Sequence, residues 1–74
     1  MRNIHDVMDI FAERLLDLIR ERGWSLNEFS NYIKIPRTTI NGWTLRTRSP
    51  KVDSLCELAD FFGVSVDYLL GRED

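Results

Sequence analysis

Histidine, cysteine and glycine are scarce in this 74-residue chain, which contains one histidine, one cysteine and four glycines. A single cysteine cannot form an internal disulfide, and this favours the reducing cytoplasm as the location. The only histidine, His5, has no cysteine or carboxylate cluster arranged around it, so material for a metal site or a histidine-based catalytic site is lacking. No glycine-rich phosphate loop is present either. We therefore expect a protein that is not an enzyme and that uses no metal or cofactor.

Long apolar runs are also absent. No run approaches the ~18 residues that a membrane-spanning helix needs, and the N-terminal stretch MRNIHDVMD lacks the apolar core of a signal peptide. A chain of about this length buries roughly 60% of its unfolded surface, which is enough for one modest core. Because 43% of the residues are hydrophobic, we expect residues 1–74 to fold as a single domain without a membrane partner.

Acidic residues are missing from one long segment, although the net charge of the chain is −2. Between Glu28 and Asp53 there is no aspartate or glutamate, and the cations of this basic segment are Lys34, Arg37, Arg46, Arg48 and Lys51. Acids instead recur at i+4 spacing near the N-terminus, at Asp9, Glu13, Asp17 and Glu21. We interpret this acidic row as a solvated face away from the functional site. Local field steers a polyanion more than net charge does, so the basic segment favours a nucleic-acid partner.

Apolar residues at helical spacing, with capping residues between them, predict an all-α fold of about five short helices. The first helix is expected over about residues 6–22. The second starts at Ser25, which has the spacing of a capping box with Glu28, while Trp24 and Phe29 take the positions of a hydrophobic staple. Two independent devices therefore agree on one helix start, and this helix is expected to end near residue 33.

Pro36 suits the first turn of the third helix. A fourth helix is expected from Ser49-Pro50 to Gly63, and a fifth is capped by Ser65, so that C-terminal helices span about residues 50–70. The inward side of the fourth helix is expected to consist of Val52, Leu55, Leu58, Ala59 and Phe62. Cys56, in the same apolar stretch, is expected to be a small core or boundary residue and not a reactive thiol.

The third helix has two sides of different chemistry. On a helical wheel one side holds Pro36, Ile40 and Trp43, and roughly opposite lie Thr38, Asn41, Gly42 and Leu45, with Arg37 and Thr39 on the flanks. A merely solvated side would carry Glu, Lys or Gln, which are better helix formers than Thr, Asn or Gly. About three residues around Lys34 join this helix to the second one. This spacing suits a helix-turn-helix over about residues 25–44.

The side chains opposite the apolar side match the chemistry of base recognition. Arginine binds guanine bidentately, asparagine pairs with adenine, and a threonine methyl contacts the thymine methyl. Glycine at this place would allow a close approach of the backbone. The predicted base-reading residues are Arg37, Thr38, Thr39, Asn41 and Gly42. The alternative is that the threonines and Asn41 are ordinary solvated positions and that Arg37 pairs with a carboxylate elsewhere.

The chain resembles the phage-repressor-like helix-turn-helix domains of the Cro and lambda repressor type over about residues 10–71. The motifs that carry the resemblance are GWSLNEFS at 23–30, IPRTTINGW at 35–43, SP at 49–50 and LCELADFFGVSVDYLLG at 55–71. The resemblance implies a sequence-specific DNA-binding domain of a transcriptional regulator, with a repressor as the expected type. It also implies the five base-reading positions above and a phosphate-contacting loop that contains Thr44, Arg46, Thr47, Arg48 and Ser49. We expect further phosphate contacts from Ser25, Lys34 and Lys51.

Three positions depart from the family pattern. Leu26 stands where the family often has a glutamine that supports recognition, and Lys34 replaces the glycine of the turn. Pro36 stands where a capping serine is usual, which would leave the first N–H groups of the third helix free for a phosphate.

Assembly is expected from the C-terminal helices. On the wheels of the fourth and fifth helices, Phe61 and Tyr68 point away from the apolar sides, and aromatic residues are enriched where proteins meet. We therefore expect a weak homodimer with Phe61 and Tyr68 near its axis, on a palindromic operator. The alternative for this surface is that either aromatic folds back over the edge of the core. The alternative is a protein-interaction module of the same fold, such as an antitoxin or an adaptor, although such a module has no need to keep acids out of the basic segment.

Overall fold

The computed structural model describes the backbone of residues 4–73 and the side chains of residues 7–73. Residues 1–3 and 74 of the predicted domain, and the side chain of His5, lie outside this description. The described chain consists of five helices joined by short loops and contains no strand: α1 (Ile4–Glu21), α2 (Leu26–Ile33), α3 (Arg37–Thr44), α4 (Val52–Phe62) and α5 (Val66–Leu69). The all-α prediction is confirmed. Within residues 4–73, no helix has the length and apolarity that crossing a bilayer requires.

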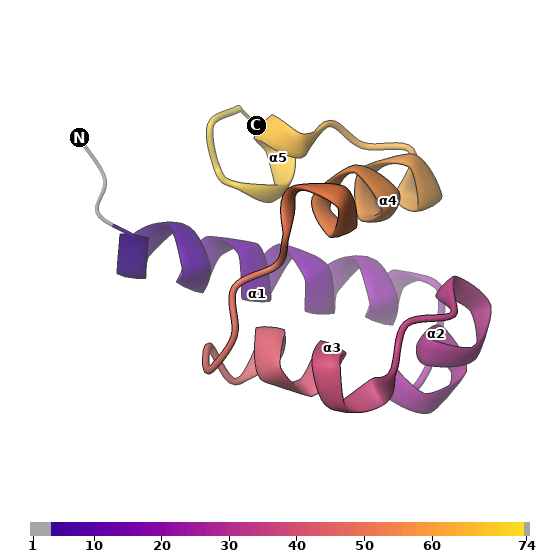
Figure 1. The fold of residues 1–74 in the computed structure, drawn as a ribbon. Helices are drawn as coiled ribbons and strands as arrows, with labels where there is room; N and C mark the ends of the chain where they lie inside the picture. Colours follow the sequence, from indigo (N-terminus) through magenta and orange to yellow (C-terminus); the bar gives the residue numbers. More distant parts are fainter. Residues whose placement is uncertain (1–3, 74) are drawn as a thin grey trace.

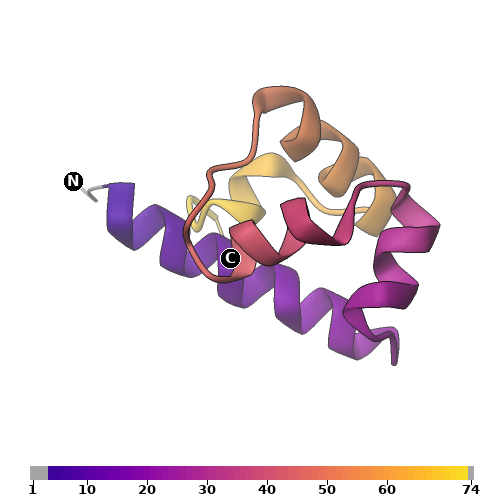
Figure 2. The same ribbon diagram turned by 60° about the horizontal axis from the view of Figure 1, so that its bottom comes forward.

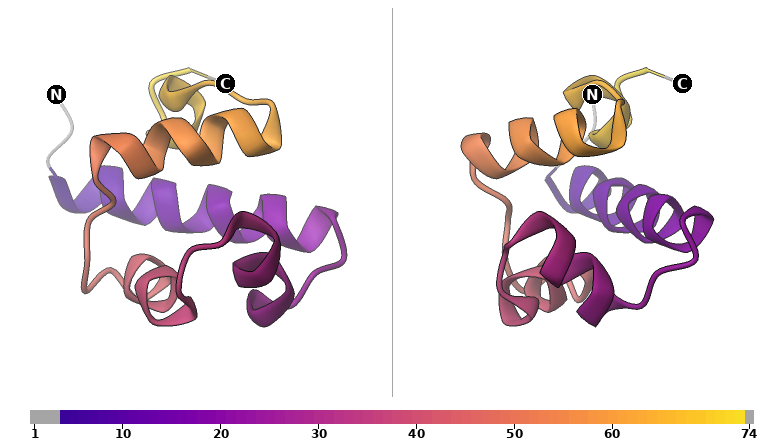
Figure 3. Two further views of the ribbon diagram at one scale, coloured as in Figure 1. Left: turned by 45° about the vertical axis from the view of Figure 1, so that its right-hand side comes forward. Right: turned by 90° about the vertical axis from the view of Figure 1, so that its right-hand side faces the viewer.

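Helix α1 runs through the middle of the molecule, with α2 and α3 on one side of it and α4 and α5 on the other (Figure 1). The views in Figure 3 show the same arrangement from two further sides. Both α3 and α5 contact α1 directly. A short turn joins α2 to α3, and the two helices lie at a steep angle to each other and do not run antiparallel (Figure 2). The helix-turn-helix therefore packs against α1 through α3.

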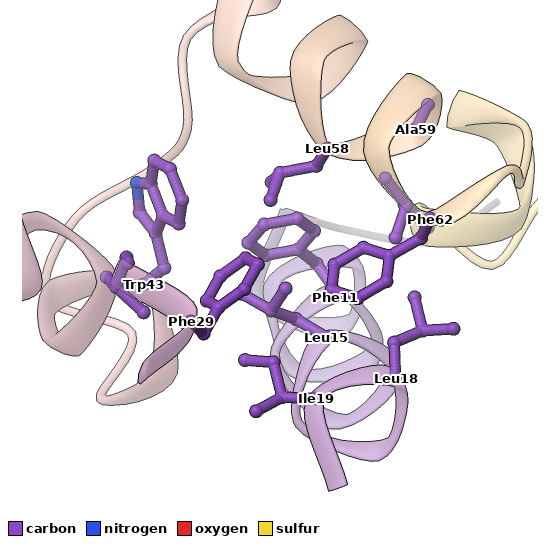
Figure 4. Close-up of a cluster of buried hydrophobic side chains, with 11 residues drawn as sticks. Phe11, Leu15, Leu18, Ile19, Phe29, Trp43, Leu58, Ala59 and Phe62 are labelled. Atoms are coloured by element: carbon purple, nitrogen blue, oxygen red, sulfur yellow. The ribbon is translucent and has the colours of Figure 1, made fainter. Parts of the chain in front are cut away.

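Aromatic side chains from four helices meet in the core (Figure 4). The core cluster consists of Phe11, Leu15, Leu18, Ile19, Phe29, Ile40, Trp43, Leu58, Ala59, Phe62 and Leu69. The Phe11 and Trp43 rings meet edge to face at a centroid distance of 6.1 Å, and Phe29 stacks on Phe62 at 5.3 Å. These contacts join α3 to α1 and α2 to α4. The prediction that Trp43 faces inward is confirmed, since this side chain is 2% exposed.

The predicted helix starts at Ser25 and Ser65 are present in the structure. The Glu28 N–H donates to Ser25 Oγ at 3.1 Å, and the Ser25 N–H donates to Glu28 Oε1 at 2.9 Å, which completes the capping box. The staple forms as well, with the Trp24 and Phe29 rings stacked at a centroid distance of 6.3 Å. At α5 the Tyr68 N–H donates to Ser65 Oγ at 2.9 Å.

Helix α4 differs from its prediction at the N-terminal end. It begins at Val52 and not at Ser49-Pro50, and its N-cap residue, Lys51, makes no side-chain capping bond. As the first residue of the helix, Val52 extends past the core and is 74% exposed, so its predicted inward position is wrong. Cys56 follows one turn later on the same side and is exposed as well, contrary to the core or boundary position expected for it.

The predicted outward orientation of Phe61 and Tyr68 is wrong. Phe61 is half-buried against α2, with its ring centroid 5.7 Å from that of Trp24 and 5.8 Å from that of Phe29. The ring of Tyr68 is half-buried and lies beneath the guanidinium of Arg14, whose carbon is 4.3 Å from the ring centroid. Both aromatics thus complete the edge of the core, because neighbouring helices cover sides that the helical wheels leave open.

Candidate nucleic-acid interface

The side of α3 that faces away from α1 carries the polar residues expected there. Arg37 and Thr38 are exposed and Asn41 is half-buried, whereas Ile40 and Trp43 on the opposite side are buried. We call Arg37, Thr38 and Asn41 the reading face, after the base-reading role predicted for them. Its backbone is held from behind by the core, so these three side chains project from a fixed helix toward solvent.

Arg37 is supported by a residue that the sequence analysis did not identify. Its Nη1 donates to Asn27 Oδ1 at 2.9 Å, a contact that links the first turn of α3 to the first turn of α2. Leu26, which stands at the family's glutamine position, packs against the core. The support therefore comes from the next residue along the chain. Asn27 is neutral, so the positive charge of Arg37 is not compensated by this partner.

Gly42 does not belong to the open side of α3, and its predicted role in base reading is corrected. It is buried beneath Arg48, and a Cβ at this position would lie 2.7 Å from Arg48 Cδ. Its carbonyl accepts the N–H groups of Thr47 at 2.9 Å and Arg48 at 3.1 Å. The missing side chain thus allows the loop after α3 to pack against the helix, and it does not expose backbone to a ligand.

Thr39 lies at the border between α3 and the loop, away from the line of Thr38 and Asn41. Its Oγ1 accepts a bond from Arg48 Nη1 at 3.3 Å. Both residues line an open hollow of about 490 Å³ between α3 and the start of α4, whose lining consists of Ile35, Pro36, Thr39, Trp43, Arg48, Ser49, Lys51 and Ser54. Two cations, three hydroxyls and no carboxylate line this hollow, so the charged part of its lining is positive.

The predicted phosphate-contacting hydroxyls differ in their availability. Thr44 Oγ1 donates to the Asn41 carbonyl at 3.0 Å, and Thr47 Oγ1 donates to the Gly42 carbonyl at 3.3 Å. A hydroxyl has a single proton to donate, so either threonine must give up its internal bond to reach a phosphate. Ser25 is engaged in its capping box, with the Glu28 carboxylate beside it. Within residues 7–73, no hydrogen-bond or ion-pair partner occurs for the side chains of Lys34, Ser49 and Lys51.

Arg46 is paired with a carboxylate. Its Nε is 2.6 Å from Asp9 Oδ1 on α1, and both side chains are partly exposed. Arg46 has a left-handed backbone with a φ of 62°, a conformation that ends α3 and turns this side chain toward α1. The acidic row of α1 is therefore not wholly remote from the basic segment, and the expectation that it lies away from the site is wrong for Asp9.

The first turn of α3 leaves backbone donors open. Pro36 is the N-cap residue and has no side chain that can cap, and its carbonyl accepts the N–H groups of Thr39 and Ile40. The N–H groups of Arg37 and Thr38 have no acceptor among the described residues. They lie at the positive end of the helix dipole, which favours an anion. No group of three or more potential metal ligands occurs among the described residues.

Residues 15–69 match the family described as helix-turn-helix, a span that reaches from α1 to the end of α5. The chain belongs to the helix-turn-helix family. This confirms the resemblance stated from the sequence motifs. No solved structure matches the chain closely.

Curated relatives of this helix-turn-helix chain carry the names of regulators. It is similar to the HTH-type transcriptional regulator AnsR of Bacillus subtilis, with 36% identity over 61 residues that cover 82% of this chain and 53% of the relative. It is also similar to the cryptic phage CTXphi transcriptional repressor RstR of Vibrio cholerae, with 29% identity over 65 residues, 88% of this chain and 59% of the relative. The chain spans little more than half the length of these relatives.

The turn between α2 and α3 has a lysine where the family pattern has a glycine. Lys34 ends α2 in the left-handed conformation, with φ 62° and ψ 39°, and its N–H donates to the Ser30 carbonyl at 2.8 Å. Ser30 Oγ in turn donates to the Ile35 carbonyl at 2.6 Å, which fixes the chain as it enters α3. A side chain in this conformation costs free energy that glycine would avoid. In exchange, the turn carries an exposed cation.

Proposed function

We propose that this chain is a sequence-specific, double-stranded DNA-binding domain of a transcriptional regulator, acting in the cytoplasm by binding and without catalysis. The observation that carries the proposal is the two-sided α3, with Arg37, Thr38 and Asn41 outside and Ile40 and Trp43 buried. An α-helix fits the major groove, which is about 12 Å wide. The membership of the chain in the helix-turn-helix family supports this docking mode.

Each group of the reading face has a base-edge partner. Arg37 can move from Asn27 to the O6 and N7 atoms of a guanine, because its present bond to a neutral amide is weaker than a charge pair. Asn41 suits the N6 and N7 atoms of an adenine, and Thr38 can bond to a base edge or contact a thymine methyl. The first five residues of α3 therefore supply the discriminating contacts.

Phosphates are expected on both flanks of the reading face. On one flank lies Lys34 in the turn, and on the other lies the hollow with Arg48, Ser49 and Lys51. Loop and turn residues of this kind position a protein on the duplex without reading its sequence. Thr44 and Thr47 can join only after their internal bonds rearrange, and Arg46 only in competition with Asp9. The Ser25 hydroxyl only accepts a bond in the capping box, but the Glu28 carboxylate beside it repels a phosphate. The available set is thus smaller than the predicted one.

Two finer features belong to this proposal. One α3 of eight residues is only about 12 Å long, so a single copy reads few base pairs. We therefore propose that two copies occupy a palindromic operator, with half-sites about 34–36 Å apart. A repressor is the expected type of regulator, and the name of the phage relative supports it. Because Phe61 and Tyr68 are half-buried, no interface is assigned to them.

Selection from random duplexes at two salt concentrations tests the proposal. We expect one enriched sequence family and an affinity that falls steeply with salt, because phosphate contacts release counterions. A duplex with the selected bases scrambled serves as the control and should bind far more weakly. Recovery of no preferred sequence, together with affinity that does not respond to salt, would contradict DNA recognition and favour the protein-interaction module.

Sedimentation with duplexes of one and two half-sites tests the assembly. We expect one copy on the single site and cooperative loading of two copies on the palindrome. Independent loading of the two half-sites would show that the domain binds as separate monomers.

A further inference from the structure

Leu45 is a large apolar side chain that no neighbouring element covers. It is the C-cap residue of α3, with a helical backbone (φ −89°, ψ −2°), and its N–H donates to the Asn41 carbonyl at 2.9 Å. Its side chain is 69% exposed and belongs neither to the core cluster nor to the side chains packed against that cluster. Leu45 therefore contributes little to holding this domain together.

The position of Leu45 on α3 distinguishes it from an ordinary exposed leucine. It follows Thr38 by seven residues and Asn41 by four, and successive residues of a helix turn by about 100°, so all three lie on the same side. Arg37 and Thr38 of this side are exposed, and Leu45 continues the same surface by one more turn. An apolar side chain thus stands in line with the reading face.

Only one apolar group is offered by base edges in the major groove, the 5-methyl group of thymine. The other base-edge groups are hydrogen-bond donors or acceptors, which leucine cannot satisfy. One helical turn rises about 5.4 Å, and base pairs are about 3.4 Å apart along the duplex. A contact from Leu45 therefore falls one or two base pairs from the base pair that Asn41 contacts.

We propose that Leu45 is a specificity-determining residue that recognises a thymine through its 5-methyl group. The proposal rests on the proposed DNA-binding function and narrows it to operators with a thymine beside the base pair that Asn41 reads. The substitution Leu45→Ala is suitable for the test, because alanine preserves the helix. The exposed Leu45 side chain makes no contact with the core, so its removal should not change stability.

The experiment uses the preferred duplex obtained by selection, in which each thymine is replaced singly by deoxyuridine. This replacement removes only the 5-methyl group. For the wild-type chain we expect about a fourfold loss of affinity at one thymine that Leu45 contacts, the change that corresponds to one buried methyl-sized group. Leu45→Ala should bind the original and the substituted duplex equally at that position.

Two control variants separate Leu45 from other methyl groups and from general apolar contact. Thr38→Ser removes the threonine methyl of the reading face and should leave the response at the Leu45 thymine unchanged. Val52→Ala removes another exposed apolar side chain, outside α3, and should leave the whole deoxyuridine profile unchanged. Melting temperatures of all three variants should match the wild type.

Each contrary outcome overturns the proposal. A wild-type chain that is indifferent to every deoxyuridine shows that no methyl group is read. Equal responses of the wild type and Leu45→Ala at every thymine show that Leu45 is not the reader. Loss of the response in Thr38→Ser assigns it to Thr38. If selection yields no preferred duplex, the proposed function fails and this inference fails with it.

Discussion

The inward and outward sides of α3 differ in burial, and under the proposed function they separate stability from DNA recognition on one short helix. The inward side consists of Ile40 and Trp43, which are buried against α1 and the rest of the core. The outward side carries Arg37 and Thr38, which are exposed and contribute little apolar burial. Because burial contributes most of the free energy of folding, the inward side decides whether α3 exists at all. The residues of the outward side are not constrained by packing, so their identity can be determined by the ligand that they contact.

The largest effect is expected from Trp43→Ala. Removing this indole leaves a cavity beside Phe11 and should lower the free energy of unfolding by about 3–5 kcal/mol, a large share of the ~5–15 kcal/mol that such domains have. Urea denaturation measures the loss, and DNA binding should disappear with the fold. Thr38→Ala on the outward side is the control and should change stability by less than about 0.5 kcal/mol. An unchanged melting temperature of Trp43→Ala would contradict the view that the inward side of α3 provides its stability.

Arg37→Ala should weaken DNA binding and leave stability unchanged, whereas Trp43→Ala should lower stability. The fold should keep its melting temperature, while binding to the preferred site weakens by about 1–3 kcal/mol and discrimination relaxes at one or two base pairs. Arg37→Lys keeps the charge but lacks the bidentate geometry, so it should retain general affinity and still lose discrimination. Arg20→Ala, on α1, controls for the loss of one positive charge. Site preference that survives both Arg37 variants would show that another part of the chain reads the bases.

What could be predicted from the sequence is local. Capping at Ser25 and the two-sided α3 depend on residues within one helix of each other, and their spacing already determines the geometry. The inward position of Trp43 follows in the same way, because Trp43 lies on the apolar side of the helical wheel and that side must face the core.

What could not be predicted depends on which elements meet in space. A helical wheel gives the direction of a side chain about its own axis but does not say what lies there. Phe61 lies opposite the apolar side on the wheel of α4 and still meets Trp24, which precedes α2. The Asp9–Arg46 pair joins residues 37 positions apart, and it depends on the left-handed backbone at Arg46. The cover of Arg48 over Gly42 likewise depends on the path of a loop.

A smaller effect is expected at the turn that sets the angle between α2 and α3. Lys34 has a left-handed backbone, so Lys34→Gly should raise the free energy of unfolding relative to Lys34→Ala by about 1 kcal/mol, because only glycine adopts this conformation without strain. Both variants lose the same cation, so both should lose the same modest amount of DNA affinity. Thermal denaturation measures the difference in stability, and a binding titration measures the affinity of each variant. A different affinity of the two variants would mean that the turn geometry, and not only its charge, contributes to recognition.

The smallest effect is expected from Asp9→Asn, which tests whether α1 restrains the DNA-binding surface. The Asp9 carboxylate lies 2.6 Å from Arg46 and compensates a cation of the basic segment. With asparagine in its place, Arg46 becomes available to a phosphate, so all sequences should bind a few-fold more tightly and the salt slope should steepen by about one. Stability should fall by less than about 1 kcal/mol, because exposed ion pairs contribute little. Asp17→Asn is the matched control, since this exposed acid of α1 has no ion-pair partner among the described residues, and it changes the net charge by the same amount. If the two variants gain affinity equally, the gain comes from net charge alone and the Asp9–Arg46 pair places no specific restraint on binding.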